Sequence, residues 1–332
     1  MYIIKKIGFF IFLCVVILLY TGFTYQNASI HGYDDDSAFD LYLLASFHEE
    51  AAAPSWAETV MRAFAAAYPG RIGPVEYRNG DWAFFLDGRW FYYAQGRILP
   101  AERRGHIEEY RPLIHLTGNY LAELPSWEST AANREVFARQ MEETRRQPQT
   151  GPQPPRAQYF HKTLWNIRNQ NEAWARQVRI DFLGHRLTIH SGISHKVKRI
   201  EEIILAEAKT NPAVCQWVSS LGTVTGWGWR NVAGSGHRST HSYGIAIDIL
   251  PRNLGGLATY WLWSARYNPE WWNIPFSRRY HPPNEVISAF ESFGFIWGGK
   301  WLNHFDTMHF EFRPEAFILS NIPMTNFCYN CP

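Results

Sequence analysis

Cysteine is scarce in this chain, with four in 332 residues. This number excludes a small scaffold held together by many disulfides. Cys215 stands alone in the sequence, and we predict a buried free thiol there. Cys328 and Cys331 form a Cys-x-x-Cys without the second pair that a zinc knuckle needs, so we interpret residues 328–332 as a tail with a small disulfide loop.

A strong charge of one sign is also missing, because 32 basic residues and 30 acidic residues leave a formal net charge of +2. This balance gives no basis for a nucleic-acid partner, and we predict none. Phosphate-cradling glycine loops are absent, since Gly255-Gly256 alone is too weak a signal. With 332 residues and 46% hydrophobic content, the chain can bury a large core and has room for two domains.

The N-terminus carries an apolar run from Ile7 to Leu19 behind Lys5 and Lys6. This charge pattern predicts a cytoplasmic N-terminus and an exported remainder. The run is shorter than the roughly 20 residues of a spanning helix, so residues 1–23 are either a signal peptide or a membrane anchor. No small-x-small cleavage site follows, which favours an anchor in the inner membrane and a protein on the periplasmic side of the cell envelope.

Residues 24–146 are predicted to form an N-terminal module with a helix and an aromatic β-meander. Ser55-x-x-Glu58 is typical of a helix start, and Pro69-Gly70 of a helix end. Asn79-Gly80 and Asp87-Gly88 predict two hairpin turns and therefore three strands. The aromatic strands favour either binding of the cell wall or a partner, or a scaffold without a ligand, and we prefer the scaffold. A helix is predicted over 127–146.

The Pro- and Gln-rich stretch 147–156 predicts a linker and a domain boundary. The second domain, 157–327, should begin with a helix near 158–174. A hairpin follows, with a turn at 183–185, and Ser194 is expected to cap the next helix. A further helix is predicted to start at 282–284 and to end at Gly294. Because helices are mixed with antiparallel strands, we predict an α+β fold with a central antiparallel sheet.

Two stretches of alternating polarity place metal-binding side chains on strand faces. In 244–249 the isoleucines would face the core and Asp248 the other side, while in 308–312 His309 shares a face with Glu311. His241 lies just before the first strand. Two His and a carboxylate suit a catalytic zinc ion, which keeps a position open for water. Asp306 remains as a general base.

Each of these residues taken singly is more simply a surface or capping residue. Their joint occurrence favours a metal site, because a carboxylate among Ile, Gly and Ala is costly to bury unless it is paired or bound to a metal. His237 and His304 are rival ligands that do not fit the alternation, so we assign them supporting or surface roles. Glu311 either orients a ligand or is a surface charge.

The motifs also resemble those of a known family. The residues that carry the resemblance are Ser239-x-His241-x-x-Gly244-x-Ala246-x-Asp248, then Trp297-Gly-Gly and Asp306-x-x-His309-Phe-Glu311. They resemble the zinc D-alanyl-D-alanine carboxypeptidases and L-alanyl-D-glutamate endopeptidases of bacterial cell walls and phage lysins. That group includes the vancomycin-resistance D,D-dipeptidases and shares its fold with the hedgehog signalling domain. The resemblance covers roughly the second half of the chain.

The resemblance implies that His241, Asp248 and His309 bind Zn²⁺ and that Asp306 is the catalytic base. It also implies an upstream arginine that steadies the substrate, for which Arg230 is the candidate; a surface charge beside a tryptophan pair is the alternative for Arg230. The implied substrate is a peptidoglycan stem peptide, from which terminal D-Ala is removed or which is cut between L-Ala and D-Glu.

A non-catalytic cell-wall-binding domain on the same fold is the rival interpretation. The presence of all three ligands together with Asp306 is the feature that speaks against it. The Trp-rich stretch 252–280 separates the two motifs and either walls the cleft or packs locally.

Overall fold

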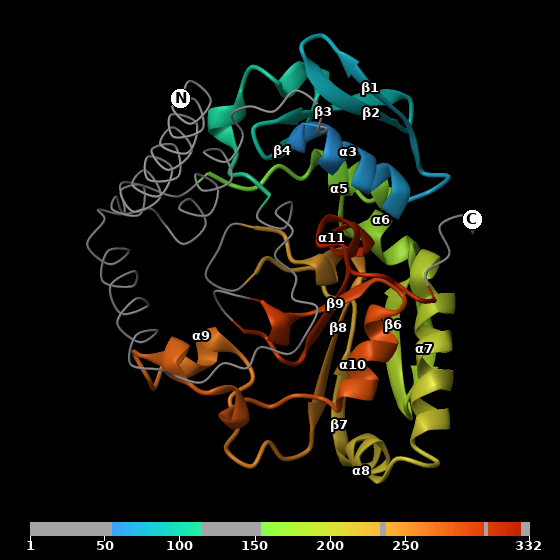
Figure 1. The fold of residues 1–332 in the computed structure, drawn as a ribbon, viewed down its shortest axis with the longest axis vertical. Helices are drawn as coiled ribbons and strands as arrows, with labels where there is room; N and C mark the ends of the chain where they lie inside the picture. Colours follow the sequence, from blue (N-terminus) through green and yellow to red (C-terminus); the bar gives the residue numbers. More distant parts are fainter. Residues whose placement is uncertain (1–54, 114–153, 233–236, 302–304, 327–332) are drawn as a thin grey trace, which may run out of the picture.

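The computed structural model describes residues 55–113, 154–232, 237–301 and 305–326. These residues form helices and antiparallel sheets (Figure 1). The predicted mixture of helices with antiparallel strands is therefore confirmed. The strands are β1 (Ile72–Arg78), β2 (Asp81–Leu86), β3 (Arg89–Ala94), β4 (Arg97–Pro100), β5 (Gln177–Phe182), β6 (His185–His190), β7 (Leu221–Thr225), β8 (Ala246–Pro251), β9 (Phe295–Trp297) and β10 (His309–Phe312). The α-helices are α3 (Trp56–Ala67), α5 (Tyr159–Leu164), α6 (Gln170–Ala175), α7 (Ser194–Glu207), α8 (Pro212–Ser220), α9 (Trp261–Ser264), α10 (Asn284–Glu291) and α11 (Pro314–Leu319).

The central sheet has the strand order β7-β8-β10-β9, with every pair antiparallel. Its formation follows from the alternation in the sequence, because Ile245, Ile247 and Ile249 are all buried while Asp248 points to the other face. The two strands predicted from alternation are therefore confirmed as β8 and β10. The predicted hairpin is also confirmed, as β5 and β6, with its turn at Leu183-Gly184.

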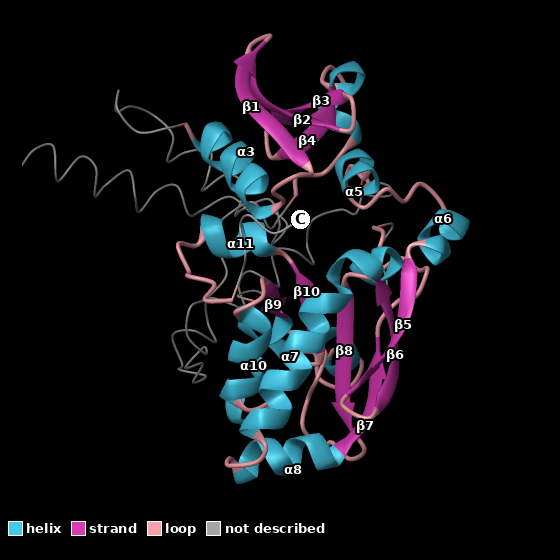
Figure 2. Cartoon of the chain, turned by 90° about the vertical axis from the view of Figure 1, so that its right-hand side faces the viewer, coloured by secondary structure: helices cyan, strands magenta, loops and turns pink. Residues whose placement is uncertain are grey.

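Helices α7 and α10 pack against each other and bury apolar stripes at helical spacing. Phe290 of α10 stacks on Phe310 of β10, with ring centroids 4.0 Å apart, which fixes the helix to the central sheet. Figure 2 shows these helices beside the strands. Helix α10 begins after Pro283 and is followed by Gly294 in the left-handed region, as predicted.

The N-terminal module is one helix and a four-stranded antiparallel sheet, β1-β2-β3-β4. Ser55 caps α3 by accepting a hydrogen bond from the Glu58 backbone amide at 3.2 Å, as predicted. The prediction of three strands was wrong. A third turn, at Gln95-Gly96, has the same pair of positive φ angles as the two predicted turns and adds β4. Its glycine follows Gln rather than Asn or Asp, which hid the turn in the sequence.

The module shares one apolar cluster with the second half of the chain. Helix α3 lies against α11, and Phe64 contacts Phe160 edge-on at 5.0 Å. In Figure 2 these two helices lie where the upper sheet meets the rest of the molecule. The two parts on either side of the predicted linker are therefore packed together.

Three further predictions were wrong in detail. The helix expected near 158–174 is two short helices, because Asn166 takes a positive φ of 53°. The second helix, α6, is capped by Asn169, whose side chain accepts a hydrogen bond from the Glu172 amide. Ser194 is the first residue of α7 rather than its cap, and its hydroxyl donates to the Ser191 carbonyl. Cys215 is exposed, because it lies beside the buried stripe of α8 rather than on it.

Several predictions fall outside the described residues: the segment 1–23, the helix 127–146, most of the linker 147–156, His304 and the tail 328–332. Within the described ranges, no helix combines the length and apolarity needed to cross a membrane.

Candidate metal centre and active site

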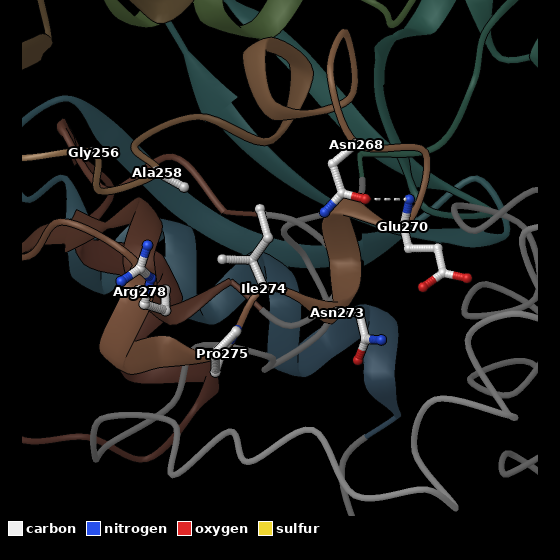
Figure 3. Close-up of a pocket in the computed structure, with 8 residues that line it drawn as sticks. All are labelled: Gly256, Ala258, Asn268, Glu270, Asn273, Ile274, Pro275 and Arg278. Atoms are coloured by element: carbon white, nitrogen blue, oxygen red, sulfur yellow. Dashed lines mark hydrogen bonds between the residues drawn. The ribbon is translucent and has the colours of Figure 1, made fainter.

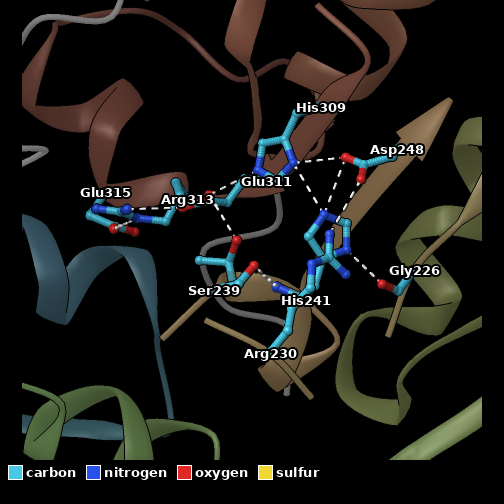
Figure 4. Close-up of polar contacts among 10 residues, drawn as sticks. Gly226, Arg230, Ser239, His241, Asp248, His309, Glu311, Arg313 and Glu315 are labelled. Atoms are coloured by element: carbon cyan, nitrogen blue, oxygen red, sulfur yellow. Dashed lines mark hydrogen bonds and ion pairs between the residues drawn. The ribbon is translucent and has the colours of Figure 1, made fainter. Parts of the chain in front are cut away.

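His241, Asp248 and His309 come together from three elements (Figure 4). His241 lies in the short helix η5 (Thr240–Tyr243), Asp248 in β8 and His309 in β10. Asp248 Oδ1 is 2.9 Å from His309 Nδ1 and 3.2 Å from His241 Nε2, and the two imidazole nitrogens are 3.3 Å apart. One ligand atom from each residue lies within 4.8 Å of the others.

Two local features bring these side chains into place. The antiparallel register puts His309 directly opposite Asp248. The turn after η5 is made by Gly244, whose φ is 72°; a Cβ there would lie 1.9 Å from the Gln177 side-chain oxygen and 2.8 Å from the His190 amide. Only glycine fits this position, and it sends the chain from His241 straight into β8.

Each histidine is held by its outer nitrogen. His241 Nδ1 donates to the Gly226 carbonyl at 2.5 Å, and His309 Nε2 donates to Glu311 Oε2 at 3.1 Å. Both acceptors require a proton on that nitrogen, so in the neutral imidazoles the lone pairs lie on His241 Nε2 and His309 Nδ1, which face Asp248. This arrangement is the usual one for metal-binding histidines.

The electrostatics of the three residues favour a cation among them. Burial would raise the pKa of Asp248, but the two imidazoles lower it well below its usual range. Burial would lower the pKa of His309, but hydrogen bonds to Asp248 and Glu311 raise it well above its usual value. Two nitrogens and a carboxylate oxygen are a suitable donor set for zinc, so the residues fit this metal.

Asp306 lies beside the three candidate ligands. Its backbone amide donates to the Gly298 carbonyl and its own carbonyl accepts from the His309 amide, both at 3.1 Å. A Cβ on Gly298 would lie 2.5 Å from the Asp306 carbonyl oxygen, so the glycine allows this approach. The carboxyl oxygen Oδ1 is fully covered and has no hydrogen-bond partner among the described residues. Burial raises the pKa of Asp306 to about 7.

Arg230 also reaches the site. Its Nη2 lies 3.6 Å from Asp248 Oδ2, while half of its side chain, 51%, stays exposed. The Ser242 hydroxyl accepts from the Arg230 amide at 2.9 Å, and the Ser239 amide donates to the Arg230 carbonyl at 3.1 Å. The backbone of Arg230 is thus tied to the turn that carries His241, and its guanidinium can meet a ligand from the solvent side.

The other predicted candidates differ in position. His237 is not grouped with the candidate ligands, and its Nδ1 accepts from the Arg156 backbone amide at 3.1 Å. Glu311 shares the face of His309, as predicted, and contacts its ring nitrogen. Sequence reasoning missed Arg313, which donates hydrogen bonds to both Glu311 and Glu315. The charge alternation Glu-Phe-Arg-Pro-Glu was the signal that could have found them.

The stretch 252–280 borders the site on one side and packs locally on the other. Tyr260 forms an antiparallel bridge with Asp306, and the Trp261 amide donates to the Phe305 carbonyl at 2.9 Å. Trp271 is buried against Trp261, with ring centroids 5.0 Å apart. Local packing of this stretch is therefore confirmed at Trp271, and its backbone borders Asp306 at Tyr260, while a role as wall of a substrate cleft stays a prediction.

The same stretch has a hollow of its own, about 360 Å³ in volume (Figure 3). The residues that line it are Gly256, Ala258, Asn268, Glu270, Asn273, Ile274, Pro275 and Arg278. None of them belongs to the group of candidate ligands. The Asn268 side chain accepts from the Glu270 amide at 2.9 Å, which shapes the rim rather than offering a bound group a partner.

Two family models match the chain. One, described as D-alanyl-D-alanine carboxypeptidase, covers residues 233–312, and the other, described as a domain of unknown function (DUF8518), covers residues 60–115. No curated protein and no solved structure gives a significant match. The first model contains His241, Asp248, Asp306 and His309, and the second spans most of α3 and the β1–β4 sheet. The first match supports the M15 peptidase family for this chain and, with it, a peptidase.

Proposed function

We propose that this protein is a zinc-dependent peptidase that removes terminal D-Ala from peptidoglycan stem peptides, on a hedgehog/DD-peptidase-like fold. The observation that carries the proposal is the convergence of two imidazole nitrogens and one carboxylate oxygen within 4.8 Å, next to a second carboxyl group, that of Asp306, whose Oδ1 is buried. The match to a D-alanyl-D-alanine carboxypeptidase model supports the substrate class.

His241, Asp248 and His309 would hold the zinc ion. A zinc ion bound there would polarise the scissile carbonyl and lower the pKa of a water molecule. Gly226 and Glu311 keep both histidines in the tautomer that this role needs. Asp248 supplies the negative charge, and its low pKa keeps it ionised throughout the neutral range.

Asp306 would move the proton. Its pKa of about 7 lets the carboxylate accept a proton from the attacking water and release it to the leaving amine. Among the described residues no donor occupies the covered Oδ1, so this oxygen is available to accept the proton. The covered Oδ1 is in a water-poor setting, and a backbone bridge from Tyr260 holds Asp306 in place.

Metal binding can be tested on the full chain before any substrate is chosen. We expect a single zinc ion per chain, and removal by a chelator should lower the melting temperature. Binding at about 1,000 times Kd stabilises the folded state by about 4 kcal/mol, so the shift should be large and reversible on adding zinc back. A melting temperature that changes neither on adding chelator nor on adding zinc would contradict the metal assignment.

Arg230 would stabilise the oxyanion that forms during attack, and Arg230→Ala should lower kcat by about 100-fold. Zinc content should be unchanged, because Arg230 is not among the candidate ligands. Arg186→Ala is the matched control: it also removes an exposed arginine paired with an aspartate, Asp181. Equal kcat values for the Arg230 and Arg186 variants would contradict a catalytic role of Arg230 and favour the alternative that it is a surface charge.

The substrate lies outside the cytoplasmic membrane, so the proposal includes export to the cell envelope. Residues 1–23 are the proposed signal or inner-membrane anchor. Cleavage between L-Ala and D-Glu is the alternative for the bond that is cut, and the products of the reaction distinguish the two.

A further inference from the structure

A chain of buried polar groups runs from the candidate zinc ligand His309 to the N-terminal module. His309 Nε2 donates to Glu311, whose other oxygen accepts from Arg313 Nη1 at 3.0 Å. Arg313 Nε donates to Glu315 Oε1, and Glu315 Oε2 accepts from the hydroxyl of Tyr68 at 2.7 Å. Figure 4 shows the part from His309 to Glu315. Tyr68 is the C-cap residue, directly after the last residue of α3.

All the members of this chain are buried. Tyr68, His309, Glu311 and Arg313 are each at most 7% exposed, and Glu315 is fully covered. Buried charges of this kind are costly unless each is paired and hydrogen-bonded. Thr240 adds a further hydrogen bond, from its hydroxyl to Glu311 Oε2 at 3.0 Å. Loss of any one of these donors would therefore leave a buried carboxylate with one hydrogen bond fewer.

Tyr68 is well suited to end such a chain. Burial and the neighbouring Glu315 raise the pKa of Tyr68 well above its usual value, so the hydroxyl keeps its proton and remains a donor. Its ring packs edge-on against Trp165 and Phe312, at centroid distances of 6.0 and 6.2 Å. The position of the hydroxyl is thus set by packing around β10 as well as by α3.

We propose that Tyr68 is a positioning residue for the metal centre, acting through Glu315, Arg313 and Glu311 on His309. The N-terminal module is then a structural part of the peptidase site rather than only a spacer. Without the hydroxyl, Glu315 Oε2 loses its donor in a buried place, and Glu315 competes with Glu311 for the Arg313 guanidinium. Glu311 then holds the His309 proton less firmly. This inference rests on the proposed zinc site.

The test is Tyr68→Phe in the full chain, which removes the hydroxyl and keeps the ring. Loss of an outer partner of a metal ligand weakens metal binding by about 10- to 100-fold, and Tyr68 acts at longer range, so we expect zinc affinity to fall by about three- to tenfold. Affinity is measured by competition with a chromophoric chelator. The control is Tyr280→Phe, because Tyr280 is equally buried and its hydroxyl accepts from Trp217 Nε1 at 2.9 Å, away from the site.

A double-mutant cycle with Glu315→Gln separates positioning from general loss of stability. If Tyr68 acts through Glu315, Tyr68→Phe should weaken zinc binding much less in the Glu315→Gln background than in the wild type. Equal effects in both backgrounds, or an unchanged zinc affinity with only a lower melting temperature, would overturn the proposal. Because the readout is zinc affinity, the inference can fail while peptide hydrolysis is confirmed. Failure of wild type to bind zinc would instead overturn the proposed function.

Discussion

Asp306→Asn should slow hydrolysis by orders of magnitude, about 10²- to 10⁴-fold, and leave zinc bound. Asn has nearly the shape of Asp but cannot take up a proton at neutral pH. The loss of a general base costs about 10²- to 10⁴-fold in rate, and we expect kcat to fall within that range. The candidate metal ligands are untouched, so zinc stoichiometry should match that of the wild type.

Two features make this expectation specific to Asp306. Its Oδ1 is covered and has no partner among the described residues, so the substitution breaks no hydrogen bond seen here. Burial holds the pKa at about 7, which an exposed carboxylate would not have. Asp181→Asn, at an exposed residue, is the matched control. Full activity of the Asp306 variant, with zinc bound, would show that another group takes the proton.

The substitution Asp248→Ala should also have a large effect, because it should abolish zinc binding. Asp248 is the one anionic member of the candidate ligand set, and its Oδ1 lies within 3.2 Å of both imidazoles. Loss of a ligand should exceed the roughly 100-fold upper range for loss of an outer partner. Hydrolysis should disappear with the metal.

The measurement is zinc content after dialysis, together with the stability of the metal-free protein. His309 owes its raised pKa in part to Asp248, so its proton stabilises the metal-free fold at pH values below the raised pKa and this contribution fades as the pH rises through it. Asp248 itself has a lowered pKa and contributes only above the ordinary carboxyl range, so its variant should lose most stability between that range and the raised pKa of His309. A variant that retains zinc at wild-type affinity would place the metal elsewhere.

The site residues could be grouped from the sequence because alternation is a local signal. Ile245, Ile247 and Ile249 define the buried face of β8, and this alone turns Asp248 to the opposite face. The strand register that pairs Asp248 with His309 depends on how β8 and β10 meet in the folded protein, and it cannot be predicted from a local sequence pattern. The same is true of Gly226, whose carbonyl holds His241 from 15 residues away.

The errors have equally definite causes. Gln95-Gly96 forms a turn that is usually written with Asn or Asp, so β4 was missed. Asn166 has a positive φ and interrupts the helix that was predicted as one piece near 158–174. Tyr68 lies 247 residues before Glu315, and nothing in the sequence around either residue reveals that they form a hydrogen bond. Contacts of this kind depend on how the module packs, which pattern reasoning does not reach.

The central claim is metal-dependent hydrolysis of stem peptides, and one measurement tests it most directly. The full chain, or a version starting at Ser55 that keeps α3, is incubated with defined muropeptides, with zinc and after chelation, and the products are weighed by mass spectrometry. We predict loss of a terminal D-Ala with zinc and none after chelation. A fragment that begins with D-Glu would move the cut to the L-Ala–D-Glu bond. Intact muropeptides in the presence of a zinc-loaded protein would contradict the account and favour a binding domain on this fold.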